Sequence, residues 1–272
     1  MLTCQLNTSV KIEKKEKKDI TTLLNKVYFT PRLKKIDLYA NRAEELQHQV
    51  LNRLVRMAEN TEWGKKYDYK SIHTYEDFRN RLPIQTYEEV KPYVERLRAG
   101  EQNLLWSSEI RWFAKSSGTT NDKSKFLPVS KESLNDTHYQ GGKDAVTLYL
   151  AQNPDSRFFS GQGLILGGSH SPNLNSRHGL VGDLSAILIQ NIHPLVNCVR
   201  VPSKKIALMS DFEKKIEAIA NSAVSKNVTS LSGVPSWMLV LIKRILEKTG
   251  KESLEEIWPN LEVFFHGGVA FT

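Results

Sequence analysis

A run of hydroxyl and glycine residues followed by lysines is the part of this sequence best suited to chemistry. Residues 116–120 read Ser-Ser-Gly-Thr-Thr, and Lys123 and Lys125 follow them. Gly118 lets the backbone come close to a ligand, while the hydroxyl groups and exposed amides donate hydrogen bonds and the lysines supply positive charge. This combination favours the binding of a polyphosphate.

One alternative interpretation of the same segment is excluded and another remains open. The P-loop of nucleoside triphosphatases requires Gly-x-x-x-x-Gly-Lys-Ser/Thr ahead of a helix, and no Gly-Lys pair occurs in this segment. An ordinary polar hairpin fits the composition as well, because Ser, Thr, Gly and Asn are common turn residues. In either case the apolar runs at residues 112–114 and 126–129 predict a strand, a loop and a second strand.

Two glycine-containing segments near the end of the chain also follow apolar runs. Gly267-Gly268-Val269-Ala270 comes after residues 261–265, and Ser232-Gly233-Val234-Pro235 comes after residues 228–231. Open α/β sheets bind ligands outside the carboxyl ends of their strands, so the first segment is a candidate binding site, although a tight turn would explain a Gly-Gly pair equally well. The second segment predicts a helix start, with Trp237 packed in the core.

Histidines offer little further chemistry. Gly167-Gly168-Ser169-His170 could indicate a phosphate loop or a catalytic histidine, and His193 and His266 also lie near apolar runs. No Asp or Glu stands at a spacing that indicates a triad or a metal site with any of them, so His170 and His193 are interpreted as groups in the core or at its rim.

Taken together, three motifs resemble the acyl-acid amido synthetases, a branch of the adenylate-forming superfamily known from plant auxin and jasmonate conjugation and with bacterial relatives. Residues 116–120 with Lys125 are similar to that family's phosphate-binding motif. Gly233-Val-Pro-Ser-Trp237 resembles its helix start, and Trp258-Pro-Asn-Leu261 leading into residues 266–268 resembles its adenosine pocket. The similarity runs from about Thr21 to the last residue.

The resemblance implies an ATP-dependent ligase with ATP and Mg²⁺ as cofactors. The carboxylate of a small acid attacks the α-phosphate, pyrophosphate leaves, and the amine of an amino acid then forms an amide. By the same resemblance, the helix after the phosphate loop binds the acyl group. His266 stays a candidate for the nucleotide pocket, because its neighbours match that pocket in the family. The implied catalytic residue is Lys125, and the implied nucleotide-binding residues are Ser116, Ser117, Gly118, Thr119, Thr120, His266, Gly267, Gly268 and Val269.

Two departures from the family pattern affect these expectations. Most of the superfamily has glycine where this chain has Asn121, a residue that tolerates left-handed backbone geometry, and Asp122 makes the loop unusually charged. The family also continues beyond the position of Thr272 with a magnesium-binding glutamate, a ribose-binding aspartate and a mobile carboxyl-terminal domain. We therefore expect an amino-terminal fragment of a longer enzyme, inactive on its own.

Two alternative functions stay open at this point. An acyl-CoA ligase would use the same adenylation step with coenzyme A as the acceptor. A basic binding protein without enzymatic activity could act through the lysine-rich segment 11–18. Apart from that segment, the net charge of +8 over 272 residues forms no basic stripe interleaved with aromatic residues, which argues against a nucleic-acid partner.

Composition predicts an ordinary globular protein of 40% hydrophobic content. Cys4 and Cys198 are too few for a disulfide framework, and no apolar stretch reaches membrane-spanning length. We therefore expect a soluble, cytoplasmic protein without a membrane partner, acting on small carboxylic acid and amino acid substrates; the oligomeric state stays undetermined.

Periodicity predicts an α/β fold that is the large amino-terminal domain of an adenylate-forming enzyme, with mostly parallel sheets covered by helices and a helical amino-terminal region. Residues 1–18 form a disordered basic tail and residues 19–272 form part of the adenylation domain, incomplete at the carboxyl end.

A long helix from Pro31 to before Gly64 buries Leu46, Val50, Leu54 and Met57. Capping boxes at Thr74 and Thr86 begin two short helices, and Gly100 ends the second. Further helices are expected at 130–150, 211–224 and 235–248 and strands at 163–168, 228–231 and 261–265, while the apolar run 184–189 is left unassigned.

Overall fold

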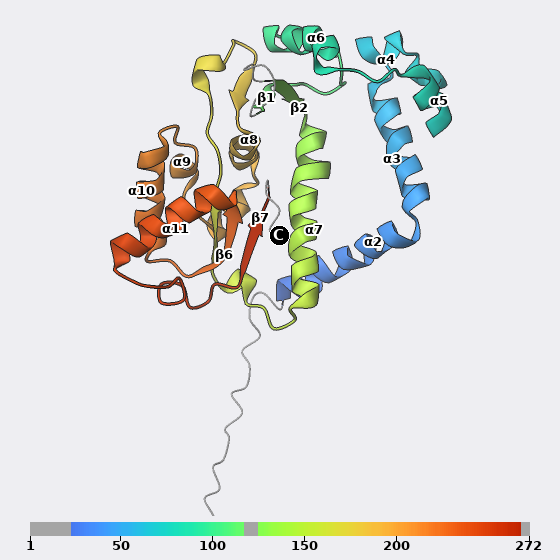
Figure 1. The fold of residues 1–272 in the computed structure, drawn as a ribbon. Helices are drawn as coiled ribbons and strands as arrows, with labels where there is room; N and C mark the ends of the chain where they lie inside the picture. The colour runs from blue at the N-terminus through green and yellow to red at the C-terminus, as the bar shows by residue number, and fades with distance from the viewer. Residues whose placement is uncertain (1–22, 117–124, 268–272) are drawn as a thin grey trace, which may run out of the picture.

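The computed structural model describes residues 23–116 and 125–267 (Figure 1). The predicted tail, residues 1–18, lies outside this part. The α-helices are α2 (Thr30–Asn41), α3 (Ala43–Ala58), α4 (Glu62–Lys66), α5 (Tyr75–Arg81), α6 (Tyr87–Ala99), α7 (Gln140–Gln152), α8 (Leu184–Asn191), α9 (Lys204–Ala207), α10 (Phe212–Ala223) and α11 (Pro235–Thr249). The strands are β1 (Trp112–Lys115), β2 (Phe126–Val129), β3 (Gln162–Leu166), β4 (Leu180–Gly182), β5 (Arg200–Val201), β6 (Val228–Gly233) and β7 (Val263–His266).

Two sheets form the centre of the molecule. The smaller has the order β2-β1-β4, with β1 antiparallel to β2 and parallel to β4. The larger has the order β5-β3-β6-β7 and is parallel throughout. The mostly parallel α/β fold is thus confirmed, and so are the strands predicted from the apolar runs 112–114 and 126–129.

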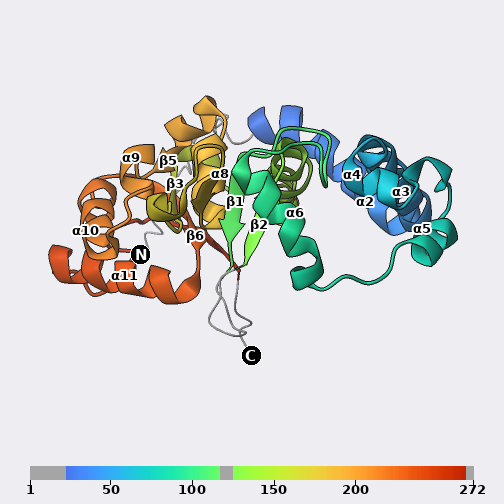
Figure 2. The same cartoon turned by 90° about the horizontal axis from the view of Figure 1, so that it is seen from above.

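Helices cover the larger sheet on both faces. On one face α10 and α11 pack against it in a core that includes Leu164, Ile219 and Leu241, with Trp258 fully buried and its indole nitrogen donating to the Ala223 carbonyl at 3.1 Å. On the other side lies α7, which the π-helical turn η3 (Ser133–Tyr139) precedes. Figure 2 shows the two sheets side by side, flanked by α10 and α11 at one end and by α2 to α5 at the other.

Most of the predicted element boundaries are confirmed. Thr74 and Thr86 both form reciprocal capping boxes, with Asp77 and Glu89 respectively, and Gly100 ends α6 at a positive φ of 110°. Asp211 caps α10 by accepting from the Lys214 amide. The unassigned apolar run at residues 184–189 forms helix α8.

The single helix predicted from Pro31 to Gly64 is wrong, because the segment divides into α2, α3 and α4. Arg42 leaves the helical region at φ −137° and ψ 35°, which separates α2 from α3. Thr61 then stops α3 and starts α4, since its hydroxyl donates to the Ala58 carbonyl at 2.7 Å and accepts from the Gly64 amide at 2.9 Å. Gly64 therefore lies inside a helix instead of after one.

The packing face predicted on this helix is also wrong. Val50 is 46% exposed and Leu54 is 41% exposed, whereas Val55 and Ala58 are the buried residues of α3. Helical spacing places the apolar residues on one face but does not determine whether another element covers it. In Figure 1, α2 and α3 lead away from α7, which leaves this face open to solvent.

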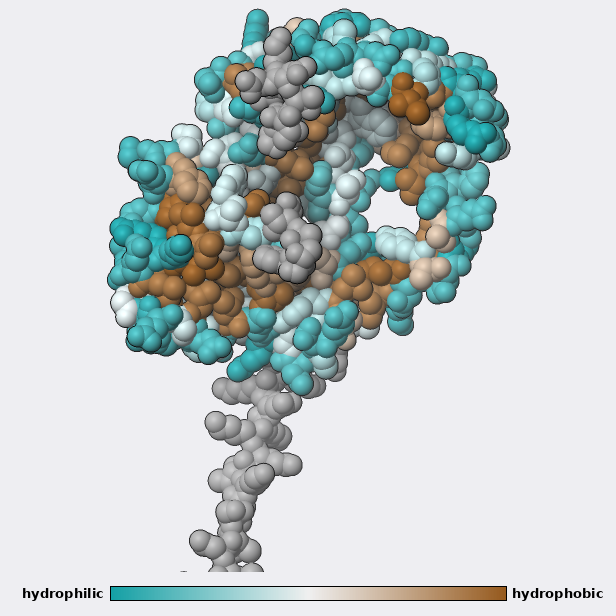
Figure 3. Space-filling model, in the orientation of Figure 1, coloured by the Kyte–Doolittle hydropathy of each residue, from teal (hydrophilic) through white to brown (hydrophobic). Residues whose placement is uncertain are grey.

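Trp237 is a further correction. The side chain is 37% exposed and packs edge to face on Phe212, with ring centroids 6.0 Å apart, so it is not part of the core. Met238, the next residue on α11, takes the buried position instead. Figure 3 shows apolar surface over the α10 and α11 side of the molecule. In the described part of the chain, no helix combines the length and apolarity needed to span a lipid bilayer.

Candidate functional site

The base of the predicted phosphate loop is closed by two hydrogen bonds between Ser116 and Lys125. The Ser116 amide donates to the Lys125 carbonyl at 2.9 Å, and the Lys125 amide donates to the Ser116 hydroxyl at 3.2 Å. The Lys125 ammonium lies 5.4 Å from the centroid of the Tyr87 ring on α6. The candidate residues Ser117, Gly118, Thr119 and Thr120 lie outside the described residues.

The second predicted group of site residues lies at the carboxyl end of the larger sheet. His266 ends β7 beside Gly233 of β6, and its ring centroid is 5.4 Å from that of Phe264. A side chain at Gly267 would meet no atom of the described residues within 4 Å, so among these residues the backbone borders open space. Gly268 and Val269 lie outside the described part of the chain.

The Gly-Gly-Ser-His segment after β3 is held by a buried charge that periodicity did not predict. Lys215 of α10 is 1% exposed, and its ammonium donates to Gly168 O and to the Ser169 hydroxyl, each at 2.9 Å. Asp183 accepts from the Ser169 amide at 2.8 Å. Burial lowers the pKa of Lys215, although the nearby Asp183 opposes this effect. The segment is a structural junction between α10, β3 and β4.

His170 packs in this junction as a rim group. Its ring lies 5.3 Å from that of Trp112, and its Nε2 atom is buried without a hydrogen-bond partner. Burial lowers its pKa, with Lys215 contributing in the same direction. Burial against Trp112 agrees with the predicted place in the core or at its rim.

A cavity of about 750 Å³ lies between α7 and the larger sheet, and the sequence did not predict it. Its walls are mainly apolar and aromatic. From the helical side it is lined by Tyr28, Phe29, Asn135, His138, Tyr139, Gly142, Lys143, Ala145 and Val146; from the sheet and its connections by Phe158, Phe159, Gly161, Gly163, Ile165, residues 191–194, Val196, Val199, Arg200, Ser230, Ser232 and Phe265.

The aromatic residues of the cavity form a connected wall. Phe29 and Phe159 stack with centroids 5.4 Å apart, and Phe158 contacts Phe159 edge to face at 4.7 Å. Phe158 also lies 6.0 Å from Phe265 of β7. Such ring contacts stabilise both partners and leave a rigid, apolar surface for a ligand.

Tyr139 closes the cavity near the start of α7. Its hydroxyl donates to the Leu188 carbonyl at 2.8 Å, and burial raises its pKa, so it stays protonated. Asp144, on the same helix, takes no part in the cavity. It pairs with Arg32 at 2.6 Å, and the hydrogen bond from Arg32 is the main cause that lowers the pKa of this carboxyl group.

The site residues predicted from the sequence lie at the ends of both sheets. Ser116 and Lys125 lie at the carboxyl edge of the smaller sheet, and His266 and Gly267 at that of the larger one. The resemblance pointed to the helix after the phosphate loop for acyl binding, but no sequence pattern was used to predict the cavity beneath it. One signal was available: Ser230 and Ser232 stand two residues apart on β6, which indicates a polar stretch on one face of this strand.

Clusters of metal-binding side chains are absent from the described part of the chain. Within residues 23–116 and 125–267, no group of three or more His, Cys, Asp or Glu residues could hold a metal ion.

Comparison with known proteins identifies the family. The GH3 family N-terminal domain matches residues 32–272. An indole-3-acetic acid-amido synthetase GH3.2 of Arabidopsis thaliana is 31% identical over 103 residues, 38% of this chain and 19% of that protein. A jasmonoyl–L-amino acid synthetase, JAR4, of Nicotiana attenuata is 26% identical over 106 residues, 39% of this chain and 18% of that protein. The matches thus span less than a fifth of these relatives.

Solved structures show the same fold. The GH3.15 acyl acid amido synthetase superimposes with a TM-score of 0.61 at 20% identity, covering 79% of this chain and 38% of its own. A structure of AtGH3.15 in complex with 2,4-DB gives the same TM-score over 75% of this chain and 36% of its own. With the family match over most of the sequence, this chain belongs to the GH3 family of acyl-acid amido synthetases.

Proposed function

We propose that this chain forms the acid-binding and phosphate-binding part of an enzyme that uses ATP to join a small carboxylic acid to an amino acid. The observation that carries the proposal is the cavity beneath α7, which is lined mainly by apolar and aromatic side chains and lies on the sheet that ends in His266 and Gly267. In this proposal, residues 19–272 are part of the adenylation domain.

The cavity has the chemistry of a site for the body of an organic acid. Its aromatic wall and Ile165 exclude water from a flat or branched apolar group. The carboxylate would lie toward Asn135 and His138, at the start of the helix, because this end is nearest to the carboxyl edge of the strands. The acid would then enter with its apolar part deepest.

Activation of the acid calls for charge stabilisation more than for proton transfer. The carboxylate oxygen forms a bond to the α-phosphorus of ATP while the bond to pyrophosphate breaks, and negative charge shifts to the leaving group. Lys125 and the Ser116 hydroxyl would hold the phosphate chain at the edge of the smaller sheet. The open space beside Gly267 would admit the adenosine part. No step is assigned to Mg²⁺, because the described side chains do not form a site for it.

An amino acid is favoured over coenzyme A as the acceptor, since the similar proteins are amido synthetases. The decisive experiment is carboxylic-acid-dependent ATP–pyrophosphate exchange, with the longest native product of the gene and a panel of aryl, indolyl and aliphatic acids. We expect exchange with at least one aromatic acid. Product analysis with amino acids and with coenzyme A then separates the two acceptors, and absence of exchange with every acid would overturn the proposal.

A further inference from the structure

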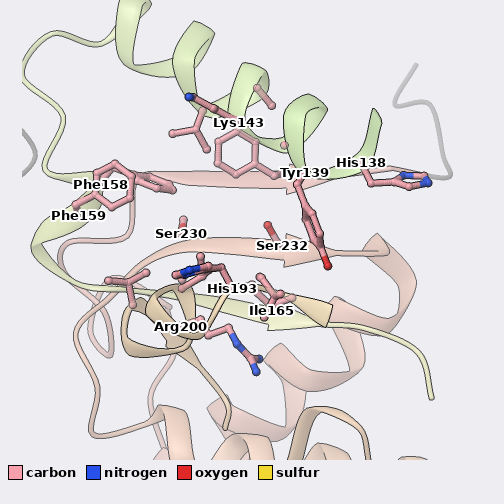
Figure 4. Close-up of a pocket in the computed structure, with 18 of the residues that line it drawn as sticks. His138, Tyr139, Lys143, Phe158, Phe159, Ile165, His193, Arg200, Ser230 and Ser232 are labelled. Atoms are coloured by element: carbon pink, nitrogen blue, oxygen red, sulfur yellow. The ribbon is translucent and has the colours of Figure 1, made fainter. Parts of the chain in front are cut away.

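The two ends of the cavity differ in polarity (Figure 4). His138 and the carboxyl ends of the strands lie at one end, and Phe158 and Phe159 lie at the other end. Ser232 faces the cavity toward the first end and Ser230 toward the second. The two serines are two residues apart on β6, which separates their levels by about 7 Å along the strand.

Ser230 is an unusual residue for the floor of an apolar cavity. It is 4% exposed, and its partner on β3 is Gly163, which has no side chain to cover it. A side chain on Gly163 would approach the Ser230 hydroxyl to 3.0 Å, so the glycine keeps this hydroxyl open to the cavity. Neither Ser230 nor Ser232 uses its hydroxyl in a side-chain hydrogen bond with another described residue. A hydroxyl that faces the cavity can pair with a polar group of a bound ligand.

His193 adds a polar group at the same end of the cavity. Its Nδ1 accepts from the Leu195 amide at 3.3 Å, so a proton on the neutral ring is carried by Nε2. His193 and Ser230 both line the cavity, and Figure 4 draws them at the same end of it. The ring therefore presents an N–H group within a mainly apolar wall.

Lys143 of α7 also lines the cavity, and its ammonium lies 3.5 Å from the centroid of the Tyr28 ring. The hydroxyl of Ser230 and the imidazole of His193 are thus polar groups in a mainly aromatic cavity. Such a set binds an electron-rich oxygen substituent on a ring better than it binds a bare hydrocarbon.

We propose that Ser230 and His193 select acids whose aromatic ring carries an oxygen substituent, such as a hydroxyl group, at the end remote from the reacting carboxylate. The proposal rests on the proposed function, because it assumes that the cavity holds the acid. Ser230 and His193 act as specificity residues and touch only the remote substituent.

The test compares phenylacetate with 4-hydroxyphenylacetate in the exchange reaction of the longest native gene product. We expect the hydroxylated acid to have a kcat/KM about tenfold higher or more, because the unpaired polar groups of the site then find a partner. In Ser230→Ala this preference should fall close to one, while the value for phenylacetate changes little. His193→Ala should reduce the preference in part, and Ser222→Ala on α10, whose hydroxyl bonds the Ile219 carbonyl, should leave it unchanged.

The outcomes separate the two proposals. Equal kcat/KM values for both acids in the wild-type protein would overturn the selectivity and leave the proposed function intact. A preference that survives in both Ser230→Ala and His193→Ala would also overturn it. Absence of exchange with any acid would instead count against the proposed function. Circular dichroism of the variants checks that a lost preference is not a loss of fold.

Discussion

The ammonium nitrogen of Lys215 lies 2.9 Å from the carbonyl oxygen of Gly168, across 47 residues of sequence. The two residues join α10 to the loop that follows β3, and the lysine is 1% exposed. An ammonium group is rarely buried unless its hydrogens are bonded, and here Gly167, Gly168 and Ser169 accept them. The loop at the carboxyl edge of the larger sheet is therefore fixed by one buried charge.

Replacing Lys215 by methionine should destabilise the chain. The variant leaves two carbonyl groups and a hydroxyl without their donor, and we expect the free energy of unfolding to fall by roughly 3 kcal/mol. Urea denaturation followed by circular dichroism measures this change. Lys214→Met is the matched control, because the neighbouring side chain is 77% exposed and its loss should cost less than about 0.5 kcal/mol. Similar values for the two variants would contradict the role of Lys215.

Gly168→Ala should disrupt the same loop for a steric reason. A methyl group at this position would lie 2.1 Å from the Oδ2 atom of Asp183, which accepts the Ser169 amide, so that hydrogen bond has to break. Gly141→Ala on helix α7 is the control without a steric clash, since its methyl group would lie more than 4 Å from the other described atoms considered. We expect a lower melting temperature for the first variant. The second should raise stability by about 0.5–1 kcal/mol.

The elements set by local chemistry could be predicted from the sequence. The capping boxes at Thr74 and Thr86 need only residues within one helical turn, and the strand, loop, strand pattern around Ser116 to Lys125 needs only its own apolar runs. The break at Arg42 and the exposed face of α3 could not be predicted, because each depends on which elements pack together. The burial of Lys215 depends on carbonyl groups almost fifty residues away, and a lysine on an amphipathic helix normally faces solvent.

The same distinction applies to the candidate site. The residues that resemble a phosphate-binding motif lie close together in the sequence, so the motif can be recognised without the structure. The cavity draws on separate segments, from Tyr28 through α7 to Phe265, and only the fold brings these together. In the sequence, the two-residue spacing of Ser230 and Ser232 was a local sign of this cavity.

Glu217 predicts a dependence of stability on pH. Hydrogen bonds from Lys248 and from Arg244 (2.9 and 2.6 Å) lower the pKa of this carboxyl group from 4.5 to about 2. A group whose folded pKa is depressed stabilises the fold above its unfolded pKa, and this contribution disappears as the pH falls toward the folded value. The wild-type protein should therefore melt above Glu217→Gln at about pH 6, and the difference should shrink by about pH 3. A constant difference would show that the carboxylate charge is not responsible.

Lys125→Ala should weaken the use of ATP with little effect on folding. The side chain is exposed and its ammonium contacts the Tyr87 ring, an interaction worth only about 0.5–1 kcal/mol at an exposed site. In the proposed function it supplies charge to the leaving pyrophosphate, and loss of one such group commonly costs about 10²–10³ in kcat. The exchange assay on the longest gene product measures the effect, with Lys131→Ala, an exposed lysine beside the start of η3, as control. Unchanged kinetics with Lys125→Ala would exclude the assigned role.

The exposed apolar face of α3 should make the 272-residue chain self-associate when it is purified alone. Leu46, Val50, Leu54 and Tyr39 border a shallow groove on α2 and α3, and contiguous apolar surface of this kind favours association in water. The double variant Val50→Lys, Leu54→Lys places two charges on this face, so light scattering should show a smaller apparent mass than for the wild type at equal concentration. Gln49→Lys adds a charge to an exposed position on the same helix and should leave the mass unchanged. A wild-type chain that is monodisperse at high concentration would show that this face does not drive association.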